Sequence, residues 1–288
     1  IIRYALERNP NLRIATLVFG ARNGSFLNSV PSIDAGINYI SQWYGTISVD
    51  VSRMLMQQYG RDVVSDPAFY LDQGHYARPV STTIVANLIA EILEPALSVQ
   101  HRPKGLPFAI DPDHFASARA LSGEQLCKRL GRVPVQYSNR RFSISALDLG
   151  SDRMRFEVGN GQLLALGYVC DPRIPPLDVT MGGEVHRAAM MKGGVRDGTY
   201  KFLVSMLSFE FLYGTKLLEA RGNVALTLSG GEEGVEHRLH VPKDSAHHEE
   251  LPAEPVLPIT GILFSGNLKI MSLEKKAAVD AVLSEAAQ

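Results

Sequence analysis

The stretch FYLDQGHYARPVSTTIVANLIAEIL, residues 69–93, decides the fold of the first part of this chain. Its second half, from residue 84 onward, repeats apolar residues at helical spacing. The Ser-Thr-Thr cluster at 81–83 is of the type that caps the start of a helix. Its first half places Asp72 three residues before His75 in a polar loop. We therefore predict a loop that carries a carboxylate and an imidazole, followed directly by an amphipathic helix.

Helix-like and strand-like segments alternate upstream of this stretch. The sequence predicts a helix over 1–9, a strand covered on both faces at 13–19 (RIATLVF), a helix over 32–44 ended by Gly45, a strand at 46–51 (TISVDV) and a helix over 52–59. This order is typical of an α/β fold, in which helices cover both faces of a parallel sheet. A loop that follows such strands lies at the edge where open α/β sheets carry reactive groups.

The pattern changes after residues 101–105 (HRPKG), where Pro and Gly break the helical periodicity. Strands are predicted at 142–147, 154–158, 163–170, 199–207, 223–229, 235–241 and 259–270, with a turn at Gly159-Asn160-Gly161 and short helices at 122–130 and 273–286. A run of strands of this kind indicates a β-sandwich. We expect two domains, an α/β domain over 1–100 and a β-rich accessory domain over 106–288.

Composition narrows the classes of partner. The chain has 288 residues and a formal net charge of −1, which gives no reason to expect nucleic acid or an anionic membrane surface as partner. The longest apolar runs are typical of core strands and fall short of the roughly 20 residues that span a bilayer. Cys127 and Cys170 lie too far apart in the sequence for a metal knuckle or a disulfide framework. Compartment and oligomeric state are not indicated.

Asp72 and His75 are the candidate catalytic residues. Three residues of separation across a turn can bring the imidazole ring within reach of the carboxylate. An ionised Asp that accepts from Nδ1–H fixes the tautomer of the ring, which leaves Nε2 free to take a proton from a serine hydroxyl. The spacing alone also fits a structural loop, because Asp and His occur this close in many proteins.

The larger order of segments resembles the closing half of SGNH/GDSL hydrolases, whose last block reads Asp-x-x-His followed by a short loop and an Ala-rich helix. The resemblance covers residues 1–97 and is most specific over 72–90. It implies a partial three-layer α/β domain with a parallel sheet. It also implies a serine esterase or acylhydrolase that needs no metal or other cofactor, with Asp72 as the orienting acid and His75 as the general base.

The chain departs from this family in its first blocks. No Gly-Asp-Ser block precedes Asp72, and the family's early oxyanion blocks are missing too. Ser25 lacks a strained nucleophile elbow and Asn23 fits a turn, so we interpret both as loop residues, and Asp50 as a solvated or capping carboxylate. Since the chain opens at Ile1 without Met, we expect a truncated sequence that is inactive without its nucleophile.

Three other groups of residues have both a functional and a structural interpretation. The His-rich stretch (Glu236, His237, His240, His247, His248, Glu249 and Glu250) fits a solvated hairpin better than a zinc site, because His237 and His240 point to opposite faces of a strand. Gly182-Gly183 and Lys192-Gly193-Gly194 fit turns between strands. The basic and aromatic residues Tyr137, Arg140, Arg141, Phe142, Arg153 and Arg155 fit either a solvated sheet face or a surface for sugar or nucleic acid.

Two functions follow as hypotheses. The first is a serine ester hydrolase acting on an acylated carbohydrate or a small ester, with Asp72 orienting His75 toward a serine that precedes this chain. The second is a noncatalytic glycan- or protein-binding protein with a degenerate hydrolase scaffold. The presence or absence of a Gly-Asp-Ser block upstream would separate them.

Overall fold

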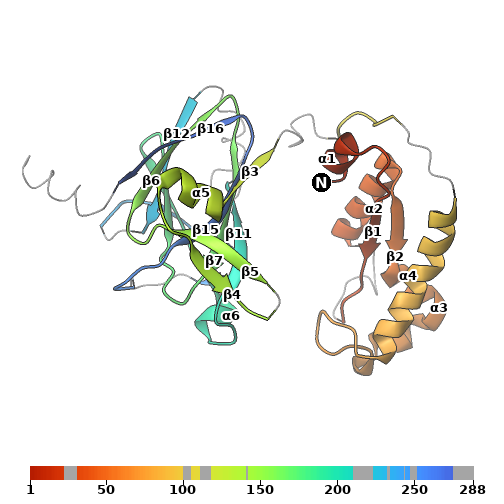
Figure 1. Cartoon of the computed structure of the whole chain (residues 1–288). Helices are drawn as coiled ribbons and strands as arrows, with labels where there is room; N and C mark the ends of the chain where they lie inside the picture. Colours follow the sequence, from red (N-terminus) through yellow and green to blue (C-terminus); the bar gives the residue numbers. More distant parts are fainter. Residues whose placement is uncertain are drawn as a thin grey trace, which may run out of the picture. The chain divides into compact units, whose positions relative to one another are not determined.

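The computed structural model describes residues 1–22, 31–99, 105–110, 118–140, 142–209, 223–231, 234–242, 244–246 and 252–274. The chain divides into two compact units, Ile1–Ala116 and Ser117–Gln288. Figure 1 shows the first unit in red to yellow and the second in yellow (β3) through green to blue. Each unit has its own hydrophobic core.

The first unit is a mixed α/β structure. Its elements are α1 (Ile2–Arg8), β1 (Ala15–Val18), α2 (Ser32–Tyr44), β2 (Ile47–Asp50), α3 (Val51–Ser65), a 3-10 turn (Pro67–Phe69) and α4 (Val80–Ser98). β1 and β2 pair in parallel, with Ala15 opposite Ile47 and Val18 opposite Asp50. Figure 1 shows α2 on one side of the two strands and α4 on the other. The α/β class predicted from the alternating pattern is confirmed.

The core of the first unit fills the space where α3 and α4 contact each other and the strands. Val49 of β2, Leu55 of α3 and Leu88 of α4 are buried there. Each such side chain contributes about 1.5–3 kcal/mol through removal of apolar surface from water. β1 is less buried than the predicted strand with two covered faces, because Ala15 is exposed and Phe19, just after the strand, is half exposed.

Two helix boundaries differ from the predicted ones. α4 begins at Val80, directly after Pro79, and no side chain caps it. The hydroxyls of Thr82 and Thr83 instead donate to the carbonyl oxygen of Pro79, at 2.9 and 2.8 Å. Because these hydroxyls donate to a carbonyl oxygen that precedes them in the chain, they do not accept the free N–H groups of the first turn. The predicted capping role was therefore wrong. α3 runs on to Ser65 through a kink at Gly60, six residues beyond the predicted end.

One described helix, α4, is long and apolar enough to cross a bilayer by length and composition. Such a helix is weak evidence of a membrane span, because core helices of other proteins pass the same test. Val85 and Leu88 of α4 pack into the core of the unit, whereas most of the helix surface is exposed.

The second unit contains two six-stranded sheets. Its elements are β3 (Arg119–Ser122), α5 (Gly123–Leu130), β4 (Val135–Ser138), β5 (Ser143–Asp148), β6 (Arg153–Gly159), β7 (Leu163–Cys170), β8 (Leu177–Met181), β9 (Glu184–Ala188), β10 (Met191–Lys192), α6 (Gly193–Arg196), β11 (Leu203–Ser208), β12 (Asn223–Gly230), β13 (Arg238–His240), β14 (Ser245–Ala246), β15 (Pro258–Phe264) and β16 (Asn267–Glu274). Sheet I has the order β11-β7-β15-β5-β4, with β3 on β15, and sheet II the order β13-β9-β8-β12-β6-β16.

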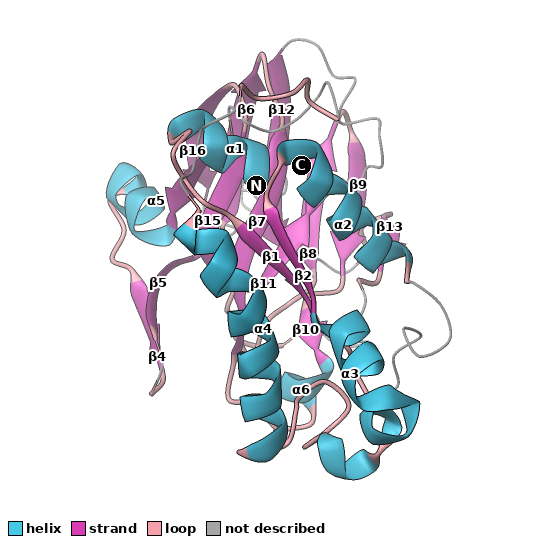
Figure 2. Cartoon of the chain, turned by 90° about the vertical axis from the view of Figure 1, so that its right-hand side faces the viewer, coloured by secondary structure: helices cyan, strands magenta, loops and turns pink. Residues whose placement is uncertain are grey.

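The two sheets share one hydrophobic core, which is the arrangement of a β-sandwich. Phe156 and Met154 of sheet II and Tyr168 and Leu166 of sheet I are fully buried in it. The hydroxyl of Tyr168 donates to the carbonyl oxygen of Met190 at 3.2 Å, which satisfies its polar atom inside the core. Figure 2 shows the strands of this unit in magenta.

Two of the turns that carry the chain from one sheet to the other differ from the predicted structure. The predicted turn at Gly159-Asn160-Gly161 is present, with Asn160 at a φ of 51°, but β6 and β7 lie in different sheets and do not pair. The predicted single strand over 259–270 is two strands in different sheets, divided at Ser265-Gly266. Leu273, the start of a predicted C-terminal helix, lies in β16, and residues 275–286 of that prediction lie outside the described residues.

The two crossing turns contact each other. The backbone N–H of Ser265 donates to the carbonyl oxygen of Gln162 at 2.8 Å, and that of Gln162 donates to Oγ of Ser265 at 3.1 Å. A Cβ added to Gly266 would lie 2.5 Å from the carbonyl oxygen of Asn160 and 2.6 Å from Cα of Gly161. Only glycine at Gly266 allows this close approach of two backbones.

Gly266→Ala should therefore destabilise the second unit more than Gly198→Ala does. Both glycines have a positive φ, 70° and 78°, but nothing lies within 4 Å of a Cβ at Gly198. We expect Gly198→Ala to cost about 1–2 kcal/mol for its left-handed backbone and Gly266→Ala at least about 2 kcal/mol more. Denaturant midpoints of the second unit measure this difference. Equal midpoints for the two variants would contradict the close approach of the turns.

Candidate active site

The Asp72–His75 segment is a closed loop. Tyr70 and Tyr76 form an isolated antiparallel bridge at its base. The backbone N–H of Leu71 donates to the carbonyl oxygen of His75 at 2.8 Å, and that of Ala77 donates to the carbonyl oxygen of Phe69 at 3.0 Å. These bonds fix the ends of the loop, so the four residues 72–75 turn within a defined frame.

Asp72 organises the inside of this loop. Its Oδ1 accepts the backbone N–H of Gly74 at 2.8 Å and that of His75 at 2.9 Å. Nδ1 of His75 lies 2.9 Å from both Oδ1 and Oδ2 of Asp72. The carboxylate thus has the contacts expected of a group that holds the imidazole with Nδ1–H directed at it and Nε2 directed away. The structure brings together the two residues singled out in the sequence.

The electrostatics of the loop favour an ionised Asp72. The backbone N–H of Gly74 and then the ring of His75 lower the pKa of Asp72 below its ordinary value. The side chains of Asp72 and His75 are 54% and 77% exposed, so the pair is open to solvent. Among the described residues, no group hydrogen-bonds to Nε2 of His75.

Hydrogen bonds attach this loop to the segment that follows β1. The hydroxyl of Tyr76 donates to the carbonyl oxygen of Gly20 at 3.0 Å. The backbone N–H of Arg22 donates to the carbonyl oxygen of Gln73 at 3.1 Å. Since Gly20 and Arg22 come just after β1 ends at Val18, the loop lies at the carboxyl end of the parallel strand pair.

An aromatic cluster under the loop supports this attachment. The ring of Tyr76 lies 5.8 Å from that of Phe69, 5.5 Å from that of Tyr70 and 6.4 Å from that of Phe19, measured between centroids. Burial and the neighbouring Tyr70 raise the pKa of Tyr76 to about 12. Tyr76 therefore stays neutral and keeps its O–H as the donor to Gly20.

Asp50 caps a helix at the same end of the sheet. Its Oδ1 accepts the backbone N–H of Arg53 at 3.0 Å and the hydroxyl of Ser52 at 2.7 Å, at the start of α3. The capping role predicted for Asp50 is confirmed. Burial, together with the charge of Asp50, raises the pKa of Asp34 on α2.

The remaining candidates from the sequence do not join this site. Asn23, Ser25, Arg141, His247, His248, Glu249 and Glu250 lie outside the described residues. Gly182 and Gly183 form the turn between β8 and β9, as predicted, with positive φ values. Lys192 instead ends the short strand β10 and Gly193 begins the four-residue helix α6, so the prediction of a turn between two strands was wrong there.

The predicted cluster of basic and aromatic residues is divided by the fold. Arg153 and Arg155 lie on β6 of sheet II, whereas Tyr137 lies on β4 of sheet I and Phe142 precedes β5 of that sheet. The arginines and the aromatic residues thus belong to different sheets, because proximity in the sequence does not fix which sheet a strand joins. Nδ1 of His186 lies 3.1 Å from Nε2 of His240, a pairing that the sequence did not indicate. No group of three or more His, Cys, Asp or Glu residues in the described ranges could hold a metal ion.

His75→Ala should raise the pKa of Asp72 toward its ordinary value but not all the way to it. The variant loses the ring donor but keeps the backbone N–H of Gly74, which lowers the pKa most. Because this pKa is depressed in the fold, the bonds to the carboxylate are retained above the ordinary value of 3.8 and lost as pH falls through the lowered value. Carbon-13 NMR of the Asp72 carboxyl during acid titration measures both midpoints.

Gly74→Ala is the matched control for this titration. It keeps the N–H donor, and its Cβ would lie in ordinary contact, 3.9 Å from Oδ1 of Asp72. The midpoint for Asp72 should stay as in the parent protein. A midpoint that does not move in His75→Ala would contradict the bond between the ring and the carboxylate.

Comparisons with known proteins add a structural neighbour. A solved structure, of a two-domain esterase (CEX) active on acetylated mannans, matches with a TM-score of 0.54 and 11% sequence identity. The match covers 93% of this chain and 67% of that one, so it includes residues of both units. No family model and no curated protein matches the chain. The chain is therefore similar in fold to a two-domain esterase.

Proposed function

We propose that this chain is part of a serine ester hydrolase of the SGNH/GDSL kind, in which Asp72 orients His75 as the general base. The observation that carries the proposal is the 2.9 Å approach of both carboxylate oxygens to Nδ1 in an exposed loop. The loop lies at the carboxyl end of parallel strands, where open α/β folds place reactive groups.

The geometry of the pair suits acyl transfer. An ionised Asp72 that accepts Nδ1–H keeps the lone pair of His75 on Nε2, and the His75 side chain is exposed. Nε2 then takes the proton of a serine hydroxyl as that oxygen attacks the ester carbonyl, and gives it to the leaving alcohol. Asp72 stabilises the imidazolium that forms between these two transfers, because its carboxylate remains charged.

We propose that the serine precedes Ile1 in the natural chain. Support comes from β1, a largely apolar strand. Its Ala15 is nevertheless exposed, and Phe19, which follows it, is half exposed. In the described residues the sheet of this unit has two strands, and parallel sheets of α/β domains are normally buried on both faces. A further strand beside β1 would complete the partial three-layer domain over residues 1–100.

The substrate that fits best is an acylated carbohydrate. Support comes from the structural neighbour, an esterase whose described substrates are acetylated mannans. In this proposal the sandwich of the second unit, predicted over residues 106–288, is an accessory domain. A noncatalytic binding protein with the same scaffold is the alternative, and the activity measurement below separates the two.

The protein with its natural N-terminal segment should hydrolyse p-nitrophenyl acetate, and His75→Ala should lower kcat by about 10³-fold or more. Asp72→Asn should lower kcat by roughly 10²–10⁴-fold, because the amide no longer enforces the correct tautomer. Initial rates against substrate concentration give kcat and KM separately.

Gln73→Ala is the control, because it changes a side chain of the same loop and keeps the backbone carbonyl that accepts from Arg22. Its kcat should equal that of the parent protein. Labelling with a fluorophosphonate, followed by peptide mass spectrometry, should locate the modified serine before Ile1. No hydrolysis and no labelled serine in the parent protein would favour the binding protein.

A further inference from the structure

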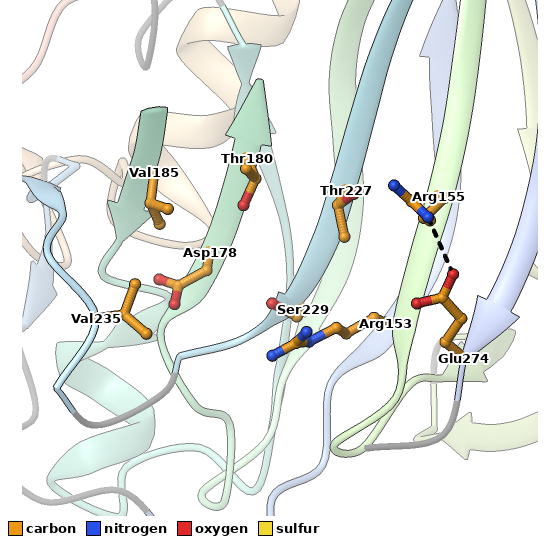
Figure 3. A pocket seen from close by; sticks show the side chains of 9 residues that line it. All are labelled: Arg153, Arg155, Asp178, Thr180, Val185, Thr227, Ser229, Val235 and Glu274. Carbon is orange, nitrogen blue, oxygen red and sulfur yellow. Dashed lines mark hydrogen bonds and ion pairs between the residues drawn. The ribbon is translucent and has the colours of Figure 1, made fainter. Parts of the chain in front are cut away.

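The outer face of sheet II contains a cavity of about 420 Å³ that the proposed hydrolysis does not use. Figure 3 shows its lining side chains, which come from five strands of the sheet and from the segment before β13. They are Arg153, Arg155, Asp178, Thr180, Val185, Thr227, Ser229, Val235 and Glu274. The volume of the cavity falls in the range of small-molecule sites, roughly 300–1,000 Å³.

The alternation of side chains along the strands places this lining on the face opposite the core. On β6, Met154 and Phe156 are fully buried in the core, so Arg153 and Arg155 point to the outer face. The same alternation on β8 buries Val179 in the core and leaves its two neighbours in the cavity wall. Charged and hydroxyl side chains therefore share one face of neighbouring strands.

The lining is polar, which excludes an apolar ligand. Val185 and Val235 are its two apolar side chains. Sites for apolar small molecules are lined mostly by hydrophobic and aromatic side chains. An apolar ligand in this cavity would cover charged and hydroxyl groups without giving them hydrogen bonds, which is unfavourable. The ligand that fits the lining is therefore polar.

The charges of the lining are balanced. It contains two arginines, Arg153 and Arg155, and two carboxylates, Asp178 and Glu274. Nη1 of Arg155 donates to Oε1 of Glu274 at 3.3 Å. Arg153 lies opposite Glu274 in the pairing of β6 with β16, and it is not without a partner either. The lining thus has no surplus of either sign with which to select an ion.

The Asp178 carboxylate is held by an arginine that lies outside the lining. Nε and one terminal nitrogen of Arg187 donate to its two oxygens, each at 2.6 Å. The side chains of Arg187 and Asp178 are only 8% and 4% exposed. A ligand with a net charge would have to displace an existing ion pair or stay without a counter-charge, and both cost free energy. A polar ligand without net charge avoids both costs.

Hydroxyl side chains lie between the charged ones. Thr227 on β12 lies opposite Arg155 on one side and opposite Thr180 of β8 on the other. Ser229 of β12 lies opposite Asp178. Side chains directly opposite each other on one face have Cβ atoms about 4.5–5.5 Å apart, so these polar groups form a close array. Each hydroxyl can donate and accept a hydrogen bond, as each hydroxyl of a sugar can.

We propose that this cavity binds an uncharged sugar. The hydroxyls of Thr180, Thr227 and Ser229 exchange hydrogen bonds with the hydroxyls of the sugar ring, and the fixed carboxylate of Asp178 accepts a further one. The two valines of the lining contact the C–H groups of the ring. The site gives the second unit an activity of its own, retention of a neutral glycan. It rests on sheet II alone and does not depend on the hydrolysis proposed for the first unit.

Binding of matched neutral and charged sugars to the full chain tests this proposal. Glucose, galactose and mannose are each compared with their uronic acid, which adds a carboxylate, and with their 2-amino sugar, which adds an ammonium group. At least one neutral hexose should bind, about fivefold or more tightly than both of its charged derivatives. Titrations followed by proton–nitrogen correlation NMR give the Kd values, and the shifted amides should lie in β6, β8 and β12. Free sugars carry no ester, so the result is separate from hydrolysis.

Two substitutions separate the hydroxyl groups from the charge balance. Thr227→Val removes a hydroxyl and keeps the branched shape, so it should weaken the neutral hexose about threefold to tenfold. Thr180→Val makes the same test from β8 if Thr227→Val does not fold. Glu274→Gln leaves arginines in excess and should tighten the uronic acid about threefold or more relative to the hexose. Thr199→Val is the matched control, an exposed threonine of the same unit outside the cavity, and should change neither affinity.

Four results would each overturn the proposal. The first is that none of the three neutral hexoses binds. The second is that a charged derivative binds as tightly as its neutral hexose. The third is that the folded threonine-to-valine variant of the cavity keeps the affinity of the parent protein. The fourth is that Glu274→Gln leaves the preference between hexose and uronic acid unchanged.

Discussion

The carboxylate of Asp72 is the group on which the candidate site depends. Three donors converge on it, the backbone N–H groups of Gly74 and His75 and the ring of His75. These bonds shape the loop and orient the imidazole at the same time, so the structure of the loop and the direction of Nε2 are one property. Loss of the negative charge would weaken all three contacts together.

The loop is held in place by contacts from outside it. Tyr76, whose ring packs on Phe69 and Tyr70, bonds to Gly20 after β1. The loop that carries the exposed Asp–His pair is therefore fixed at its base by these aromatic contacts and by the bond to Gly20. An exposed pair gains little stability from its mutual attraction, so the position of the loop depends on this base and on the backbone bonds to Asp72.

Features set by local signals were predictable from the sequence. The helix over 32–44 ends at Gly45, whose φ of 64° is the left-handed cap expected there, and the three-residue spacing brought Asp72 and His75 together. Features set by distant residues were not predictable. The turn at Gly159–Gly161 connects two sheets instead of two paired strands. Arg153 and Arg155 lie in a different sheet from Tyr137, because long-range pairing decides which sheet a strand joins.

The most direct test of this account is the tautomer of His75, measured by proton–nitrogen correlation NMR of the imidazole at a pH where the ring is neutral. A hydrogen is expected on Nδ1 and none on Nε2, and this preference should be lost in Asp72→Asn. A hydrogen on Nε2, or an even mixture of the two tautomers in the parent protein, would contradict the role of Asp72 in preparing a base.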